Sequence, residues 1–352
     1  MAFEDVLDAW DGEQVVLHRD RPTSSWMLIG VHSTVRGPAM GGTRLRSYGR
    51  PEEALDDVLR LSGAMTLKQA AADLPFGGGK AVIAVPEVPE PGTDERKALL
   101  LAYAGLVDSL HGTYVTAADM NTSESDMDVI GETTPHVLGR SRSKGGAGDP
   151  GAATAIGVFH GIQAAVTHWF GSADLGGHSV LVQGLGSVGG RLAEHLHEAG
   201  ANLLVSDVDE VRASAVADEI GAKVIGPEDM TSTECDVFAP CATGKVFTPA
   251  TIPTLKCRIV AGAANNQLGS SEDGERLREA GILYAPDYVV NAGGVIHLAG
   301  REALGWDELM VAERLRGIGD TLIEVFLAAE REGISTAAAA DRLARARLVP
   351  AG

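Results

Sequence analysis

Three consecutive glycines stand directly before a lysine in DLPFGGGKAVI, residues 73–83, and this arrangement could serve chemistry. A phosphate-binding loop of the form GxxxxGK[ST] needs a glycine where Leu74 stands and a hydroxyl where Ala81 stands. The phosphate interpretation therefore fails. Two interpretations remain: a tight structural turn, or a closely packed wall around the amine of Lys80, because glycine lets backbone or substrate approach closely.

Lys68 and Asp119 could complete a site with Lys80. Lys68 continues an apolar stripe at helical spacing, so its stem could pack on the core while its amine reaches water. Burial lowers the pKa of a lysine amine and a nearby cation lowers it further, which favours a neutral base near pH 7. With Asp119, the lysines suit carboxylate binding and proton transfer, although a salt-bridged structural trio fits the same spacing. The stripe consists of Ala54, Val58, Leu61 and Met65.

The stretch VLVQGLGSVGGRLAEHL carries the spacing GxGxxG between an apolar strand and a helix. That context is typical of a dinucleotide-binding turn, because glycine permits the tight turn and lets N–H groups approach a pyrophosphate at a helix N-terminus. The residues of this candidate cofactor loop are Gly184, Gly186, Ser187, Val188 and Gly189.

The next predicted strand, ANLLVSD, ends in Asp207, 18 residues after Gly189. A carboxylate at this place can accept hydrogen bonds from both ribose hydroxyls and repels a 2′-phosphate. Val208, Asp209 and Glu210 follow, so no arginine comes directly after the acid. The pattern favours NAD over NADP as the cofactor.

The length and composition limit the classes to which the protein can belong. A chain of 352 residues suits two domains, and 45% hydrophobic residues with 44 glycines are typical of a cytosolic α/β protein. A net charge of −19 argues against general affinity for nucleic acid or anionic membranes. The sequence has no apolar run of membrane-spanning length, and its acidic start lacks a signal-peptide pattern, so we expect a cytoplasmic protein.

Three cysteines, Cys235, Cys241 and Cys257, cannot all pair with one another. They form no CxxC motif or Cys/His cluster, which favours reduced thiols over a disulfide framework or a metal site. We expect no structural metal.

Residues 1–140 are predicted to mix strands and helices. Pro51 and two glutamates open the first long helix, as a first turn prefers. The glycine-rich stretch 141–151 is the strongest linker candidate. Strands are expected at 13–20, 27–34, 79–85 and 113–120, and helices at 50–73 and 94–110.

Beyond the linker, strands alternate with helices, which predicts a parallel, doubly wound sheet. We predict an α/β protein with an N-terminal mixed-sheet domain (1–140) and a C-terminal NAD-binding Rossmann domain (141–330). A C-terminal helix in 331–352 is expected to pack back toward the N-terminal domain. Helices are expected at 153–170, 187–200 and 308–333, and strands at 178–183, 201–207, 222–226, 235–241, 258–264 and 281–287.

Over nearly its whole length, the chain resembles the glutamate/leucine/phenylalanine/valine dehydrogenase family. The eight matching motifs are GPAMGGTRLR (37–46), GAMTLKQAAADLPFGGGKAVI (63–83), YVTAADMNTSESDMDVI (114–130), GGAGDPGAATAIGVF (145–159), VQGLGSVGG (182–190), FAPCATG (238–244), AGAANNQL (261–268) and YAPDYVVNAGGVIHLAG (284–300). The resemblance implies two domains with a cleft between them, of which the N-terminal one (1–140) binds the substrate and mediates assembly into a homo-oligomer. It also implies reversible NAD-dependent oxidative deamination of an L-amino acid.

The same resemblance implies a role for each matching site residue. Lys68 would grip the substrate carboxylate, and Lys80 would polarise the carbonyl and activate the attacking water. Asp119 would handle the amino group and shuttle protons. Asn265 and the backbone of Gly41 and Gly42 would assist Lys68, while Thr154, Cys241, Ala242, Ala263, Ala264 and Asn265 would line the cofactor.

The substrate side chain is expected to be apolar, because neither lysine has an identifiable cationic partner for a second carboxylate. Ala117 and Val295 resemble the leucine and valine branch, which favours a branched aliphatic substrate. Asn121 and the stretches LSGAMTLK and GGVIHLAGREALGW resemble phenylalanine enzymes, so L-phenylalanine is the alternative.

Two alternative hypotheses keep the same nucleotide site. One is a catalytically silent NAD-binding sensor, against which the intact Lys68, Lys80 and Asp119 argue. The other is a hydroxy-acid dehydrogenase with a Lys/Asp pair. Ammonium dependence of the reductive direction separates that enzyme from an amino-acid dehydrogenase.

Overall fold

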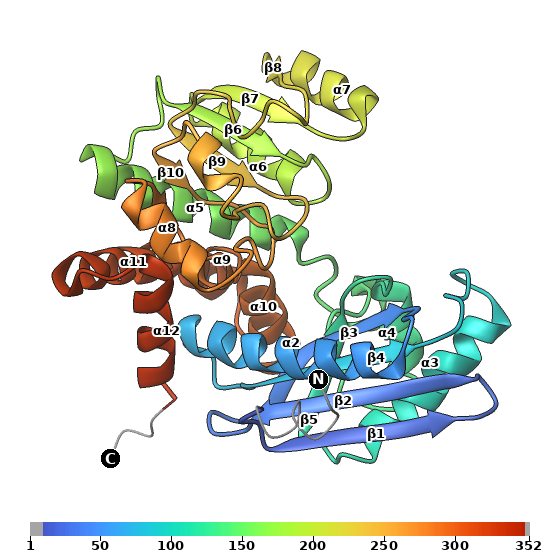
Figure 1. Cartoon of the computed structure of the whole chain (residues 1–352). Coiled ribbons are helices and arrows are strands. Elements are labelled where there is room, and N and C mark those ends of the chain that lie inside the picture. Colours follow the sequence, from blue (N-terminus) through green and yellow to red (C-terminus); the bar gives the residue numbers. More distant parts are fainter. Residues whose placement is uncertain (1–9, 349–352) are drawn as a thin grey trace. The chain divides into compact units, whose positions relative to one another are not determined.

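The computed structural model describes residues 10–348, and within them the chain divides into two compact units. The first unit comprises residues 10–149, 298–305 and 347–348, and the second comprises residues 150–297 and 306–346. Figure 1 shows one sheet with its helices in each unit. The first nine residues, on which part of the expectation about export rests, and the last four of the predicted segment 331–352 lie outside the described residues.

The first unit is built on a five-stranded mixed sheet of order β1-β2-β4-β3-β5. The outer pair β1–β2 and the pair β2–β4 are antiparallel, whereas β3 runs parallel to both β4 and β5. All eight residues of the central strand β4 are buried. The strands are β1 (Gln14–Asp20), β2 (Ser25–Ser33), β3 (Ala39–Arg46), β4 (Gly77–Ala84) and β5 (Tyr114–Ala118).

Helices cover both faces of this sheet. Successive side chains of β4 point to opposite faces, as in any strand, so they contact different helices. Ala81 and Ile83 belong to the core that includes residues of α3 and α4. Val82 and Ala84 pack with residues of α2. Lys80 therefore shares the face of β4 that α2 covers. The helices are α2 (Pro51–Ala71), α3 (Asp94–Asp108), α4 (Glu124–Ile130), the short η1 (Arg142–Lys144) and the π-helical η3 (Ala299–Ala303).

The second unit contains a six-stranded parallel sheet of order β11-β10-β9-β6-β7-β8. Chain order reverses between β6 and β9, as in a Rossmann fold, and ligands of such sheets bind beyond the carboxyl ends of the strands at that point. The strands are β6 (Ser179–Gln183), β7 (Asn202–Ser206), β8 (Lys223–Val224), β9 (Val237–Pro240), β10 (Ile259–Val260) and β11 (Leu283–Tyr284).

Long helices surround the second sheet, and α5 packs closely on α11. The approach is close because Gly157 and Gly161 of α5 face side chains of α11: an added Cβ would lie 2.7 Å from Ile318 Cδ1 and 3.0 Å from Leu322 Cδ1, respectively. The helices are α5 (Gly151–Phe170), α6 (Gly189–Glu198), α7 (Glu210–Ile220), η2 (Ile252–Thr254), α8 (Glu272–Glu279), α9 (Asp287–Val290), α10 (Gly293–Leu298), α11 (Glu308–Glu332) and α12 (Thr336–Ala346).

The predicted α/β class, with a mixed sheet followed by a parallel Rossmann sheet, is confirmed. Strand β3 was not predicted, although it lies between β4 and β5. The assignment of 1–140 to substrate binding and oligomerisation and of 141–330 to NAD binding stays a prediction. So does the packing of the C-terminal helix toward the first unit; α12 contacts α11, α8 and β11. Within residues 10–348, every helix is too short or too polar to traverse a lipid bilayer.

Candidate active site

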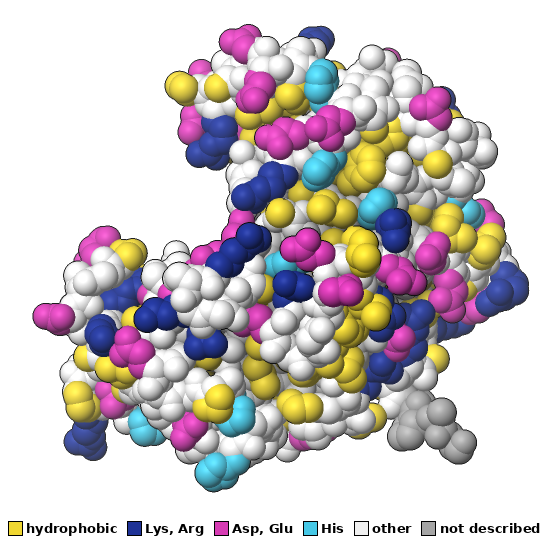
Figure 2. Space-filling model, turned by 180° about the vertical axis from the view of Figure 1, so that it is seen from behind, with side chains coloured by type: hydrophobic (Ala, Val, Ile, Leu, Met, Phe, Trp, Pro, Cys, Tyr) yellow, Lys and Arg dark blue, Asp and Glu magenta, His cyan; other side chains and the backbone are white. Residues whose placement is uncertain are grey.

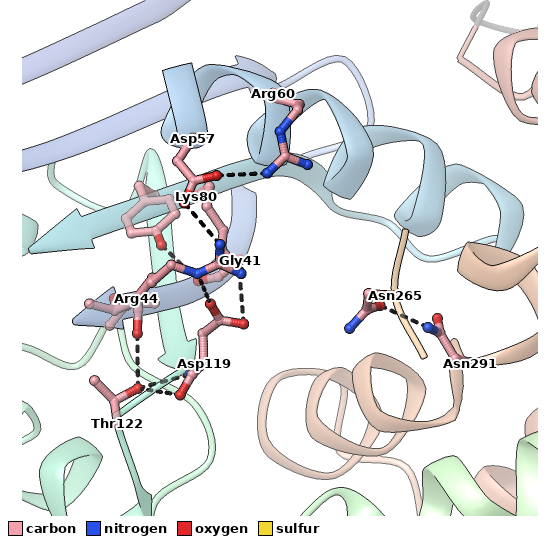
Figure 3. Close-up of polar contacts among 12 residues, drawn as sticks. Gly41, Arg44, Asp57, Arg60, Lys80, Asp119, Thr122, Asn265 and Asn291 are labelled. Carbon is pink, nitrogen blue, oxygen red and sulfur yellow. Dashed lines mark hydrogen bonds and ion pairs between the residues drawn. The ribbon is translucent and has the colours of Figure 1, made fainter. Parts of the chain in front are cut away.

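Lys80 and Asp119, both predicted to be catalytic, are in direct contact. Lys80 is only 5% exposed, and its Nζ lies 3.2 Å from Oδ1 of Asp119 (Figure 3). The aspartate follows the end of β5, which is paired with β3. The sheet thus joins residues that are 39 positions apart in the sequence.

The other oxygen of the Asp119 carboxylate is bound by Arg44 of β3, whose Nε donates to Oδ2 over 3.0 Å. The backbone around the aspartate is fixed as well. Its N–H donates to Oγ1 of Thr122 over 2.8 Å, and that hydroxyl is 2.9 Å from the carbonyl oxygen of Thr43. Asn121 adopts a left-handed conformation with φ of 60°, which turns the chain back after the carboxylate. Asp119 is therefore held by both side-chain and backbone contacts.

Burial sets the proton affinity of this pair. Desolvation lowers the pKa of Lys80, the Asp119 anion opposes this, and the Arg44 cation lowers the pKa further. Burial alone would raise the pKa of Asp119, but the cations of Lys80 and Arg44 outweigh it and bring the pKa below its usual value. The carboxylate stays ionised at neutral pH, while the amine becomes easier to deprotonate than an ordinary lysine.

The glycines before Lys80 are required by packing. A Cβ on Gly77 would lie 1.8 Å from the carbonyl oxygen of Ser33, and one on Gly78 would lie 2.1 Å from the backbone nitrogen of Thr66. A Cβ on Gly79 would lie 2.7 Å from the ring of Tyr114. Of the two remaining interpretations of the glycine stretch, the closely packed wall is the one that the structure shows, since these residues lie in the central strand rather than in a turn.

Gly41 and Gly42, predicted to present backbone to the substrate, lie in β3 next to the same wall. A Cβ on Gly41 would lie 1.7 Å from the carbonyl oxygen of Gly79, and one on Gly42 would lie 2.8 Å from Cβ of Asp119. Ala117, the predicted substrate-pocket residue of β5, is opposite Gly42 and is buried. These residues are thus neighbours of the Lys80–Asp119 pair.

Lys68, predicted to bind the substrate carboxylate, is half-buried near the end of α2. The predicted stripe leads to it, since Ala54, Val58 and Leu61 are buried, and α2 packs on β4. Lys68 therefore belongs to the helix that covers the Lys80 face of the sheet.

The predicted cofactor loop of the second unit connects β6 to α6. Gly184 has φ of 88°, a conformation that other residues rarely adopt, and its N–H donates to Ser206 over 2.7 Å. A Cβ on Gly189 would lie 1.8 Å from the carbonyl oxygen of Gly184, so the helix begins directly against the turn. A Cβ on Gly186, in contrast, would meet nothing within 4 Å. Space for a ligand is therefore present at the second glycine.

Asp207 directly follows β7, and its side chain is oriented by the cofactor loop. Its Oδ2 accepts a hydrogen bond of 2.7 Å from the N–H of Leu185, and its Oδ1 accepts one of 2.9 Å from Asp209. Burial would raise the pKa of Asp207, but these N–H groups and Arg212 lower it. Arg212 Nη1 is 3.4 Å from Oδ2, a cation that the sequence argument for NAD did not consider.

The other predicted cofactor residues follow neighbouring parallel strands of the second unit. The N–H of Cys241 donates to Gln183 over 2.7 Å, and that of Ala264 donates to Pro240 over 2.9 Å. Ala242 touches the glycine turn, because a Cβ on Gly184 would lie 2.6 Å from its Cβ. The carboxyl ends of β6, β9 and β10 thus bring these segments together, and Ala263 precedes Ala264 in the last of them.

Asn265, predicted to contact both substrate and cofactor, is oriented by Asn291. The Nδ2 of Asn291 donates to Oδ1 of Asn265 over 2.8 Å and to the carbonyl oxygen of Ala263 over 3.0 Å (Figure 3). This leaves the NH₂ group as the donating end of Asn265. Thr154 begins the second turn of α5 and faces the start of α10, since a Cβ on Gly294 would lie 2.9 Å from its Oγ1. Val295, the second predicted pocket residue, follows in α10 and is half-buried.

Sequence reasoning missed Arg44, Asp57 and Asn291, although two of them had signals. Arg44 is two residues after Gly42 and so shares its face of β3. Asp57 precedes Lys68 by eleven residues, close to three helical turns, and therefore lies on the same side of α2. Among residues 10–348, no group of three or more His, Cys, Asp or Glu side chains is arranged to hold a metal ion.

Family models match both parts of the chain. The dimerisation domain of the Glu/Leu/Phe/Val dehydrogenases matches residues 24–136, and the glutamate/leucine/phenylalanine/valine dehydrogenase domain matches residues 204–351. The chain belongs to the Glu/Leu/Phe/Val dehydrogenase family. The resemblance inferred from the eight motifs is thereby confirmed.

Individual members of this family are similar to the chain over nearly its full length. It is 43% identical to a leucine dehydrogenase of Thermoactinomyces intermedius, covering 99% of this chain and 94% of the relative. It is 44% identical to a valine dehydrogenase of Streptomyces virginiae, covering 96% and 93%, respectively. The crystal structure of L-tryptophan dehydrogenase from Nostoc punctiforme has a TM-score of 0.84 at 41% identity, covering 99% of this chain and 98% of that chain.

Proposed function

We propose that the protein catalyses the reversible, NAD-dependent oxidative deamination of an apolar L-amino acid to its 2-oxo acid and ammonia. The contact of 3.2 Å between Lys80 and Asp119, at an amine that is 5% exposed, carries the proposal. Burial makes this amine a base that can act closer to neutral pH than an exposed lysine. Deamination needs such a base, because water must lose a proton as it adds to the substrate.

Substrate binding is proposed for Lys68, for the backbone of Gly41 and Gly42, and for Asn265. Protonated Lys68 neutralises the substrate carboxylate, and the backbone of Gly41 and Gly42 offers a surface without side chains for close approach. Asn265 assists through its NH₂ group, which the hydrogen bond from Asn291 leaves as its donating end.

Proton transfer is proposed for Lys80 and Asp119. The carboxylate of Asp119 holds the substrate amino group and accepts a proton from it. Neutral Lys80 then takes a proton from the water that adds to the iminium carbon, which gives a carbinolamine. Lys80 returns this proton to the amino nitrogen, and it accepts the hydroxyl proton as ammonia leaves and the carbonyl forms. The two groups suit these roles because their environments leave one as an anion and the other as a weakened cation.

The loop after β6 fits NAD. The open position at Gly186 allows a pyrophosphate to approach the backbone. Oδ1 of Asp207, which accepts one N–H, can still accept a ribose hydroxyl. Ser187, Val188 and the segments after β9 and β10 would complete the site. When bound, NAD accepts the hydride from the substrate α-carbon.

Leucine or valine is the favoured substrate. Buried Ala117 opposite Gly42 supports this choice, as do the names of the leucine and valine dehydrogenases among the relatives. An aromatic substrate, L-phenylalanine first, is the second candidate, and the similar L-tryptophan dehydrogenase supports it.

We also propose a cytoplasmic homo-oligomer. The first unit matches a model described as a dimerisation domain, which supports assembly through that unit. Three cysteines without disulfide bonds fit a reducing compartment. Acidic and basic side chains are mixed over the face of the molecule drawn in Figure 2, which gives a nucleic acid no continuous basic surface there.

The test is NADH formation by the purified protein with NAD and L-leucine, L-valine, L-phenylalanine or a 2-hydroxy acid in separate assays. We expect turnover with amino acids, the highest kcat/KM with a branched aliphatic one, and a reverse reaction that requires ammonium. Turnover of the hydroxy acid without ammonium dependence would show a different dehydrogenase. NAD binding without any turnover would indicate the sensor.

A further inference from the structure

Arg44 lies between two carboxylates of the first unit. Its Nε donates to Oδ2 of Asp119 over 3.0 Å, and its Nη1 donates to Oδ2 of Asp57 over 2.9 Å. Figure 3 shows Asp57 and Asp119 on opposite sides of the guanidinium group. A planar guanidinium suits this task, because its donors form a rigid fork, whereas a lysine ammonium is a compact point charge.

Asp57 is itself held firmly by α2 and by the loop after β3. Its Oδ1 accepts a hydrogen bond of 2.6 Å from Arg60, one helical turn later, and its Oδ2 accepts one of 2.9 Å from the hydroxyl of Tyr48. The Asp57 side chain is only 14% exposed, as is that of Arg44, so solvent screens their ion pair little. Asp57 is therefore an anchor for Arg44.

The consequence for Asp119 is geometric. With Oδ2 bound to Arg44, the oxygen that faces the amine of Lys80 is Oδ1, at 3.2 Å. A carboxylate held at only one oxygen can rotate and exchange its oxygens, whereas this one is held by Arg44 on one side and Lys80 on the other. The contacts join α2, β3, β4 and the loop after β5.

We propose that Arg44, anchored by Asp57, is a positioning residue that fixes Asp119 so that a single carboxylate oxygen serves Lys80 and the substrate amino group. The inference rests on the proposed function for its role in turnover, but the geometry of Asp119 and its effect on the Lys80 amine do not depend on it.

The same arrangement places a permanent cation close to the proposed base. The charged groups that act on the Lys80 amine are Asp119 from the loop after β5, Arg44 from β3 and Asp57 from α2. The two carboxylates favour the protonated amine, and Arg44 disfavours it. Removing the guanidinium charge is therefore expected to make Lys80 more basic.

The experiment compares Arg44→Met, Arg44→Lys and a control, Arg36→Met. Arg36 is a suitable match because it is also in the first unit, its side chain is 20% exposed, and it pairs with Asp73 over 2.7 Å. Two quantities are measured for each variant. The first is the pH dependence of acetylation of Lys80, followed by peptide mass spectrometry, and the second is the pH profile of kcat and kcat/KM.

In Arg44→Met we expect Lys80 acetylation and the ascending limb of the deamination profile to move to higher pH, with kcat lower by about 10²-fold. Arg44→Lys keeps the charge but not the fork, so its acetylation profile should stay close to that of the unaltered protein while kcat falls. Arg36→Met should change neither profile, even if it lowers the unfolding temperature.

The inference is overturned if acetylation of Lys80 has the same pH dependence in Arg44→Met as in the unaltered protein. It is also overturned if Arg44→Lys retains full kcat. The second result decides the matter even if the methionine variant does not fold. Absence of turnover with every amino acid, together with a shifted acetylation profile in Arg44→Met, would refute the proposed function and leave the arrangement around Lys80 supported.

Discussion

Gly78 of β4 and Gly186 of the loop after β6 are the same residue type in opposite surroundings. A Cβ on Gly78 would lie 2.1 Å from a backbone atom of α2, whereas a Cβ on Gly186 would meet nothing within 4 Å. In the first unit, glycine lets protein pack against protein behind Lys80. In the second, it leaves a place for a ligand. A glycine-rich motif therefore indicates close approach, and only the structure tells what approaches.

Charge is also used differently in the two units. Lys80, Asp119, Arg44 and Asp57 form a series of alternating charges made by side chains from distant parts of the chain, in which Lys80 is buried and the other three are half-buried. The cofactor loop instead uses backbone N–H groups, and its principal side chain, Asp207, is held by N–H groups of the loop. These contacts support the proposal that the first unit moves protons and the second holds a phosphate-containing cofactor.

Lys80→Ala should give the largest difference between the effect on catalysis, proposed for the first unit, and the effect on NAD binding, proposed for the second. Loss of the proposed base is expected to lower kcat by about 10²–10⁴-fold, while NAD affinity stays unchanged because the glycine loop belongs to the other unit. Steady-state rates and calorimetric titration with NAD measure the two effects. Lys97→Ala is the control, since Lys97 is half exposed and pairs with Glu132. Equal losses in both lysine variants would contradict the assignment.

Asp119→Asn should change both rate and pH dependence. The neutral amide removes the anion that raises the pKa of Lys80, so the ascending limb of kcat/KM should move to lower pH, opposite to the shift expected for Arg44→Met. A fall in kcat of about 10²-fold is expected from the lost proton acceptor. The measurement is the pH profile of kcat/KM for deamination. If its ascending limb moves to higher pH, Asp119 does not stabilise the protonated amine of Lys80.

Gly78→Ala and Gly186→Ala test the contrast between the glycines directly. Gly78→Ala is expected to lower the free energy of unfolding by about 1–3 kcal/mol, because its Cβ would overlap α2. Gly186→Ala should change stability by no more than about 0.5 kcal/mol and still weaken NAD binding. Urea unfolding and NAD titration of both variants provide the measurement. A stable Gly78→Ala protein would mean that α2 can shift away from β4.

Asp207→Ala is expected to have the smallest effect. Without the carboxylate, Arg212 can face a 2′-phosphate, so the ratio of kcat/KM for NAD over NADP should fall by about tenfold, corresponding to ~1.4 kcal/mol. Adding Arg212→Ala should remove any gain for NADP. If the ratio of kcat/KM for NAD over NADP stays the same in both variants, other residues of the cofactor site distinguish NAD from NADP.

The sequence predicted those parts of the molecule that depend on short-range patterns. The GxGxxG loop, the stripe on α2 and the alternation of strands and helices in the second unit all lie within one or two elements. Arg44 and Asp57 could not be paired in advance, because β3 was not recognised as a strand and their contact depends on how α2 crosses the sheet. The roles of the site residues remain predictions, since the structure shows their contacts but not their part in catalysis.

The position of Lys80 in β4 has a consequence for the loss of activity during unfolding. This strand is in the middle of its sheet and every one of its residues is buried. Amide hydrogens of such a strand exchange with solvent only when the whole unit opens, whereas edge strands and loops open locally. The proposed base is thus carried by the last segment expected to open. Slow deuterium uptake should persist at Lys80 in denaturant concentrations that already release the edge strand β1.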